Sequence, residues 1–112
     1  MADAKTVAQL LLNARKPGHA LTALPENALP ADKAQAYAAQ AELVSLLNNH
    51  SGKPVGYKVG CTNATARQML ALDSPFSGRC FEKELSASPA SIDAAMLHMI
   101  GIEPEIAVRI GK

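Results

Sequence analysis

The sequence predicts an α+β fold, with helices in residues 1–50 and a mixture of helix and strand in residues 51–112. In the first region, apolar residues recur at the three- and four-residue spacing of a helix face, whereas in the second they alternate with polar residues as in half-buried strands. Clusters of Gly, Pro and Asn separate these segments and mark turns. With 112 residues, the chain is long enough to bury the core of a single domain.

The composition bounds the class of protein. Hydrophobic residues make up 48% of the chain and aromatic residues only 4%, so the core consists mainly of aliphatic side chains. A formal net charge of +1 lacks the basic excess typical of proteins that bind nucleic acid or anionic membranes. No apolar run approaches the roughly 18 residues of a membrane span. The two cysteines are too few for a disulfide scaffold, and we therefore expect a cytoplasmic protein. From the net charge and the lack of a long apolar run, we expect it to bind neither nucleic acid nor membrane.

Two helices are expected in the N-terminal half, and each has recognisable ends. Asp3 can cap the first helix, and Lys-Pro-Gly at residues 16–18 terminates it. Pro30 and Asp32 suit the start of the second helix, and the segment 48–52, rich in Asn and ending in Gly, terminates it. The expected buried stripes are Val7, Leu10, Leu11 and Ala14 on the first helix and Tyr37, Ala41, Val44 and Leu47 on the second.

A strand is expected over residues 54–61, and one of its faces is unusual. Lys58 lies on that face between Gly56 and Gly60, while Val55, Tyr57, Val59 and Cys61 occupy the other face. Because glycine has no side chain, a small anion or a closely approaching backbone fits beside the Lys58 ammonium group. The same pattern describes a solvent-exposed lysine on an edge strand in which the glycines mark a bulge. The residues by themselves leave both interpretations open.

The segments between residues 62 and 100 are shorter and less regular. A short helix over residues 64–72 is followed by a turn at 75–78 and a strand over 79–85. Residues 86–91 contain only Ser, Ala and Pro and predict a flexible loop. Residues 92–100 keep apolar residues at helical spacing, but the segment is short enough to be extended instead, so the pattern leaves its structure undecided.

A further strand is expected over residues 102–110, and it carries two glutamates on one face. Alternation places Glu103, Glu105 and Arg109 on one side and the branched residues Ile106, Val108 and Ile110 on the other. At a rise of about 3.3 Å per residue the α-carbons of the glutamates lie about 6.6 Å apart, so both carboxylates can bind one cation. Pro104 has no backbone donor and favours a sheet edge, where a ligand has access. The alternative interpretation is the solvent-facing side of an amphipathic strand.

Taken in order, several motifs of the chain resemble those of an enzyme family. They are Asp32 with Ala36, Tyr37 and Gln40; the segment Gly-Tyr-Lys-Val-Gly-Cys-Thr-Asn at 56–63; Asp73-Ser74-Pro75-Phe76 with Gly78; and Glu103-Pro104-Glu105-Ile106-Ala107. Together they are similar to the N-terminal part of the 2-oxopent-4-enoate (2-hydroxypentadienoate) hydratases and the related 4-oxalocrotonate decarboxylases, in the fumarylacetoacetate hydrolase superfamily. The Gly-x-Lys-x-Gly-x-Thr and Glu-x-Glu motifs are the most specific of them.

The resemblance implies a metal-dependent enzyme. Glu103 and Glu105 would be ligands of a divalent cation, Mg²⁺ or Mn²⁺, and a third acidic ligand would lie beyond Lys112. Lys58 would be a catalytic residue that lines the pocket of the small-molecule substrate and positions it or relays a proton. The chain would form the N-terminal portion of a homo-oligomeric protein whose β-rich, fumarylacetoacetase-like half lies beyond Lys112.

The activity that the resemblance implies is that of a hydro-lyase acting on a short 2-hydroxydienoate or 2-oxo acid from aromatic catabolism. One departure bears on this expectation. The hydratases typically have an aspartate after the proline of the Pro75 turn, as a partner in proton transfer, whereas Phe76 follows Pro75 here. A related 2-oxo acid decarboxylase therefore stays open as an alternative. So does a non-catalytic fragment whose helices serve assembly and whose glutamates only face solvent.

Overall fold

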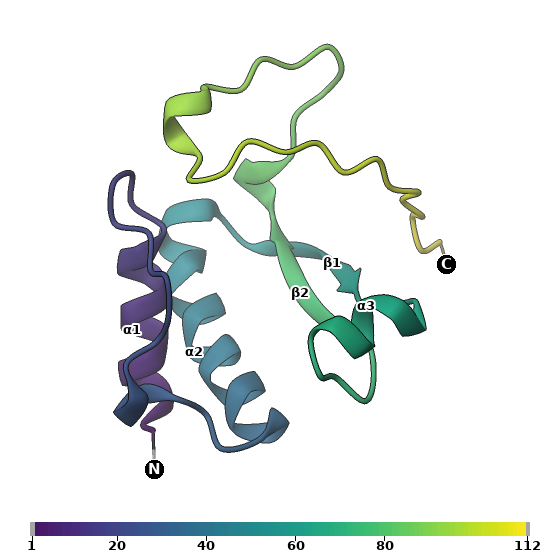
Figure 1. The fold of residues 1–112 in the computed structure, drawn as a ribbon. Helices are drawn as coiled ribbons and strands as arrows, with labels where there is room; N and C mark the ends of the chain where they lie inside the picture. The colour runs from purple at the N-terminus through teal and green to yellow at the C-terminus, as the bar shows by residue number, and fades with distance from the viewer. Residues whose placement is uncertain (1, 112) are drawn as a thin grey trace.

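The structure is a computed structural model that describes residues 2–111. Its elements are α1 (Ala4–Ala14), α2 (Lys33–Ser51), β1 (Pro54–Gly60), α3 (Ala64–Met69) and β2 (Phe76–Phe81), with short 3₁₀ turns at Glu26–Ala28, Glu82–Glu84 and Ala94–Met96. Helices α1 and α2 lie side by side, and β1 and β2 form an antiparallel sheet next to α2 (Figure 1). The described chain is thus a mixture of helix and strand, compatible with the predicted α+β class.

The two N-terminal helices begin where their capping residues predict. The Asp3 carboxylate accepts a hydrogen bond from the Thr6 N–H at 3.0 Å, and the Asp32 carboxylate accepts one from the Gln35 N–H at 2.8 Å. These bonds satisfy backbone donors that have no partner within the first turn of a helix. Helix α2 ends at Gly52, whose φ of 75° lies in the left-handed region that glycine adopts most readily. Within residues 2–111, no helix combines the length and hydrophobicity of a membrane span.

The core forms where α1, α2 and the turn Glu26–Ala28 meet. Its buried side chains are Val7, Ala28 and Ala39, with Leu10, Leu11 and Leu24 partly buried against them. Most of the residues that make this contact are small or aliphatic, as the composition predicts. Val7, Leu10 and Leu11 of the predicted α1 stripe therefore face this core, whereas Ala8, which the stripe did not include, is fully buried.

The buried face of α2 differs from the predicted stripe. Leu47 is buried as expected, but Ala41 is exposed and Ala39 is buried in its place. Tyr37 is directed toward β2, where its hydroxyl oxygen accepts a hydrogen bond from the Ser77 N–H at 3.1 Å. The reason is that α2 contacts α1 on one side and β2 on another. A buried stripe predicted from residue spacing alone assumes that the helix packs against a single neighbouring element.

Strand β2 covers Phe76–Phe81 instead of the predicted residues 79–85, so residues 76–78 belong to a strand and not to a turn. Its pairing with β1 decides where it ends. Phe81 pairs with Pro54, the first residue of β1, and the next N–H, that of Glu82, donates to the Lys53 carbonyl at 3.0 Å. β1 has no residue before Pro54 with which β2 could continue to pair, and the chain goes on as the 3₁₀ turn Glu82–Glu84.

The strand predicted over residues 102–110 is wrong. This segment is an irregular coil, drawn in yellow in Figure 1, and the sheet of the described chain contains β1 and β2. Ile102 and Ile106 are 92% and 94% exposed. An alternating pattern describes the faces that a strand would have, but a strand also requires a neighbour for its backbone N–H and C=O groups. The segment 92–100, left undecided above, is regular only at the turn Ala94–Met96.

We expect Leu47→Ala to lower the free energy of unfolding by about 2–5 kcal/mol, because it leaves a cavity at a side chain that is only 5% exposed. Met69→Ala, at the end of α3, is the control. Met69 is 80% exposed, and its truncation should change the stability by less than about 0.5 kcal/mol. Urea denaturation of both variants provides the measurement, and equal losses would contradict the packing of Leu47.

Candidate functional site

The register of the sheet surrounds Lys58 with glycines. Gly78 pairs directly with Lys58, and Gly56 and Gly60 lie two residues away on β1. Paired residues of an antiparallel sheet point to the same face. A Cβ atom added at Gly56 or Gly78 would meet no atom within 4 Å. Space is therefore open beside Lys58 at Gly56 and at Gly78, which the sequence did not connect with Lys58, whereas the Phe76 ring fills the space over Gly60. The register shift between Pro54 and Gly56 and the half-exposed Lys58 side chain also match the alternative interpretation, an exposed lysine on an edge strand with a bulge.

Glu103 and Glu105 both reach Lys58. The Lys58 Nζ lies 2.8 Å from Glu105 Oε1 and 3.4 Å from Glu103 Oε2. The two carboxylates thus turn to one side, as predicted, although a coil and not a strand carries them. The pocket that holds the three side chains has a volume of about 510 Å³ and is also lined by residues 59–63, Phe76 and Gly78.

The contact with two carboxylates favours the charged form of Lys58. The hydrogen bond to Glu105, with a smaller contribution from Glu103, raises the pKa of Lys58 above its usual 10.5. The Lys58 side chain is half exposed, so solvent screens the ion pairs and they add little to the stability of the fold. Their structural effect is local, because they connect the segment around Glu103 and Glu105 to β1.

The donor set fits part of a divalent-cation site. In the described part of the chain, no cluster of three or more His, Cys, Asp or Glu residues is arranged to hold a metal ion. Glu103 and Glu105 nevertheless each bring one oxygen to the same positive charge, the Lys58 ammonium. Carboxylates are hard ligands that Mg²⁺ and Mn²⁺ prefer, and Mg²⁺ is often held by one or two of them together with water and substrate. A divalent cation would compete with Lys58 for this pair.

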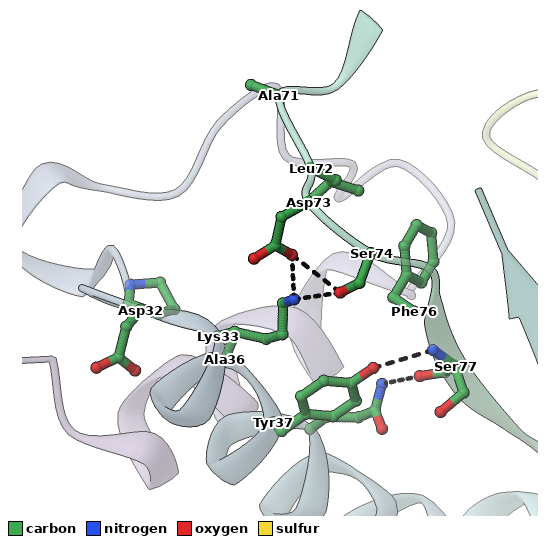
Figure 2. A pocket seen from close by; sticks show the side chains of 12 residues that line it. Asp32, Lys33, Ala36, Tyr37, Ala71, Leu72, Asp73, Ser74, Phe76 and Ser77 are labelled. Atoms are coloured by element: carbon green, nitrogen blue, oxygen red, sulfur yellow. Dashed lines mark hydrogen bonds and ion pairs between the residues drawn. The ribbon is translucent and has the colours of Figure 1, made fainter. Parts of the chain in front are cut away.

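A second pocket, of about 710 Å³, lies between α2 and the segment that leads into β2 (Figure 2). The Lys33 ammonium contacts the Asp73 carboxylate and the Ser74 hydroxyl, and it lowers the pKa of Asp73. Gln40 Nε2 donates to the Ser77 carbonyl at 2.9 Å. These contacts connect α2 to the start of β2. Gln40 and Asp73, which belong to different motifs of the family resemblance, both take part in this packing, whereas sequence reasoning gave Lys33 no role.

Comparison of the chain with protein-family models, with curated proteins and with solved structures finds no match in any of the three. The family resemblance therefore depends on the motif residues themselves. The geometry adds that the two most specific motifs, which contribute Lys58 and Glu105, meet in one pocket across 47 positions of the chain.

Lys58→Met is expected to release the segment that carries Glu103 and Glu105 from β1, because both carboxylates contact this ammonium group. The methyl NMR signals of Ile102 and Ile106 should narrow as the segment becomes more mobile. A rise in pH should have the same effect. Since the pKa of Lys58 is raised in the folded chain, the contact is fully present below pH 10.5 and is lost as the pH rises through the raised pKa.

Lys53→Met is the matched control, because it removes an ammonium group one residue before β1. It should leave the two methyl signals unchanged. Equal line widths in the wild type and in Lys58→Met would contradict the connection between Lys58 and this segment.

Proposed function

We propose that the chain carries two metal ligands and the pocket lysine of a metal-dependent hydro-lyase that acts on a short 2-hydroxydienoate or 2-oxo acid in aromatic catabolism. The observation that supports this proposal is the convergence of Lys58, Glu103 and Glu105 in one pocket. Both carboxylates contact this one ammonium group, although the Glu103 and Glu105 side chains remain 77% and 58% exposed. The proposal includes a homo-oligomer and a β-rich half beyond Lys112, as the resemblance implies.

The proposed roles follow from the chemistry of the three side chains. Glu103 and Glu105 would hold Mg²⁺ or Mn²⁺, together with a third acidic ligand beyond Lys112. When bound, the ion would supply Lewis-acid stabilisation of negative charge on the carboxylate and 2-oxo oxygens of the substrate. Lys58, which is charged at neutral pH as lysines ordinarily are, would bind the substrate carboxylate or hold a proton for transfer. The glycines beside Lys58 leave the substrate room to approach it.

The presence of Phe76 in the pocket bears on which of two reactions is proposed, hydration or decarboxylation. Its ring lines the Lys58 pocket and has no group that can transfer a proton. Hydration of a dienoate requires proton transfer, so another group would have to perform it, whereas loss of carbon dioxide depends chiefly on charge stabilisation at the 2-oxo end. A related 2-oxo acid decarboxylase is therefore the second version. Product analysis with 2-hydroxypentadienoate and with 4-oxalocrotonate distinguishes hydration from decarboxylation.

We expect Glu103→Gln and Glu105→Gln each to weaken Mn²⁺ binding by about tenfold or more, because each replaces a charged oxygen ligand by a neutral amide. Lys58→Met should instead strengthen binding, since the competing ammonium group is gone. Titration followed by electron paramagnetic resonance measures all three. Glu84→Gln is the control, because Glu84 pairs with Arg15 outside this pocket.

Two results would contradict the proposal. One is Mn²⁺ affinity that is the same in the wild type, Glu103→Gln and Glu105→Gln. The other is turnover of 2-hydroxypentadienoate by the full-length protein after chelation has removed divalent cations.

A second candidate function, assembly, is favoured by the exposed apolar side chains of residues 102–110, the C-terminal segment. Ile102, Ile106 and Ile110 are almost fully exposed, and Val108 is exposed to a somewhat smaller extent. Apolar side chains left in solvent become more stable when a partner covers them. The segment also lacks a strand partner for its backbone groups, which favours pairing with another chain.

If this second function is correct, the 112-residue chain should self-associate, and the double substitution Ile106→Ser with Ile110→Ser should reduce the association because it removes apolar surface. Sedimentation velocity over a range of concentrations measures the effect. Arg109→Ser, in the same segment, is the control and should associate like the wild type. A wild-type chain that sediments as a monomer at every concentration would contradict the assembly function.

A further inference from the structure

Phe76 forms an aromatic wall of the Lys58 pocket. It pairs with Gly60 across the sheet, and its ring packs directly on the Gly60 backbone. A Cβ atom added at Gly60 would lie only 2.6 Å from the ring Cζ, so the ring leaves no room for a side chain there. The same ring also lines the pocket beside α2, and it therefore stands between the two cavities.

Lys58 and Phe76 lie on one face of the sheet, and both line the same pocket together with Glu103 and Glu105. Lys58 pairs with Gly78, and Phe76 is two residues before Gly78, so Lys58 and Phe76 are diagonal neighbours. The α-carbons of positions related in this way are roughly 7–8 Å apart, and a Cβ atom added at Gly78, which pairs with Lys58, would meet no atom within 4 Å. A pocket lined by an ammonium group and an aromatic ring suits a ligand with a charged end and an apolar tail of a few carbon atoms. The charged end would face Lys58, and the tail would lie against the ring.

We infer that Phe76 is a specificity-determining residue, whose ring selects 2-oxo acids with an apolar tail of several carbons over those with a single methyl group. This inference rests on the proposed function, because it takes the Lys58 pocket as the substrate site. The physical basis is the apolar area that a longer tail removes from water against the ring. An acid with only a methyl group has less apolar area to place against the ring.

The test is calorimetric binding of pyruvate and of 2-oxopentanoate, in the presence of Mn²⁺, to the full chain. The wild type should bind 2-oxopentanoate about tenfold more tightly than pyruvate, which is the size of effect that two further methylene groups produce in an apolar pocket. Phe76→Ala should reduce this ratio to about twofold, mainly by weakening the binding of 2-oxopentanoate. Phe76→Leu, which keeps an apolar side chain, should retain an intermediate ratio.

Gly60→Ala is the second variant, because it keeps the aromatic ring but forces it away from the β1 backbone. It should lower the preference for 2-oxopentanoate even if Phe76→Ala does not fold. A preference that persists unchanged in Gly60→Ala, or in a folded Phe76→Ala, would overturn the role of Phe76 while the proposed function stands. Failure of the wild type to bind either acid would instead overturn the proposed function.

Discussion

The antiparallel register between β1 and β2 is the constraint on which the candidate site depends. Because Lys58 pairs with Gly78 and Gly60 pairs with Phe76, the face that carries the ammonium group has open space beside it and an aromatic ring at one end. A shift of the register by one residue would bring a residue with a side chain opposite Lys58 and would turn β2 over relative to β1. The positions of the ammonium group, the open space and the aromatic ring relative to one another therefore follow from one strand pairing.

Helix α2 supports this pairing from the side. Tyr37 and Gln40 bind the backbone N–H and C=O of Ser77, so the helix satisfies groups on β2 that would otherwise be open to another strand. Lys33 adds a contact to Asp73 and Ser74, just before β2 begins. The pocket beside α2 and the pocket at Lys58 meet at the start of β2, where Phe76 lines both.

The C-terminal segment combines two properties that lead to different proposals. Its carboxylates contact Lys58, which supports a metal site, whereas its branched apolar side chains remain in solvent, which supports assembly. The segment has few connections to the rest of the chain. Besides the Lys58 ion pairs, a contact lies just before this segment: His98 Nε2 is 2.6 Å from the Ala14 carbonyl oxygen, at the end of α1. Exposed ion pairs are weak, so a ligand or a partner chain could rearrange this segment at low cost.

The sequence by itself determined the features that depend on neighbouring residues. Asp3 and Asp32 cap helices because their carboxylates bind N–H groups three residues away, and the alternation in 54–60 defines the Lys58 face within one strand. Only the tertiary structure decided that Gly78 lies opposite Lys58 and that residues 102–110 remain a coil. Strand pairing requires backbone partners from distant parts of the chain, and an alternating pattern carries no information about whether such a partner is present.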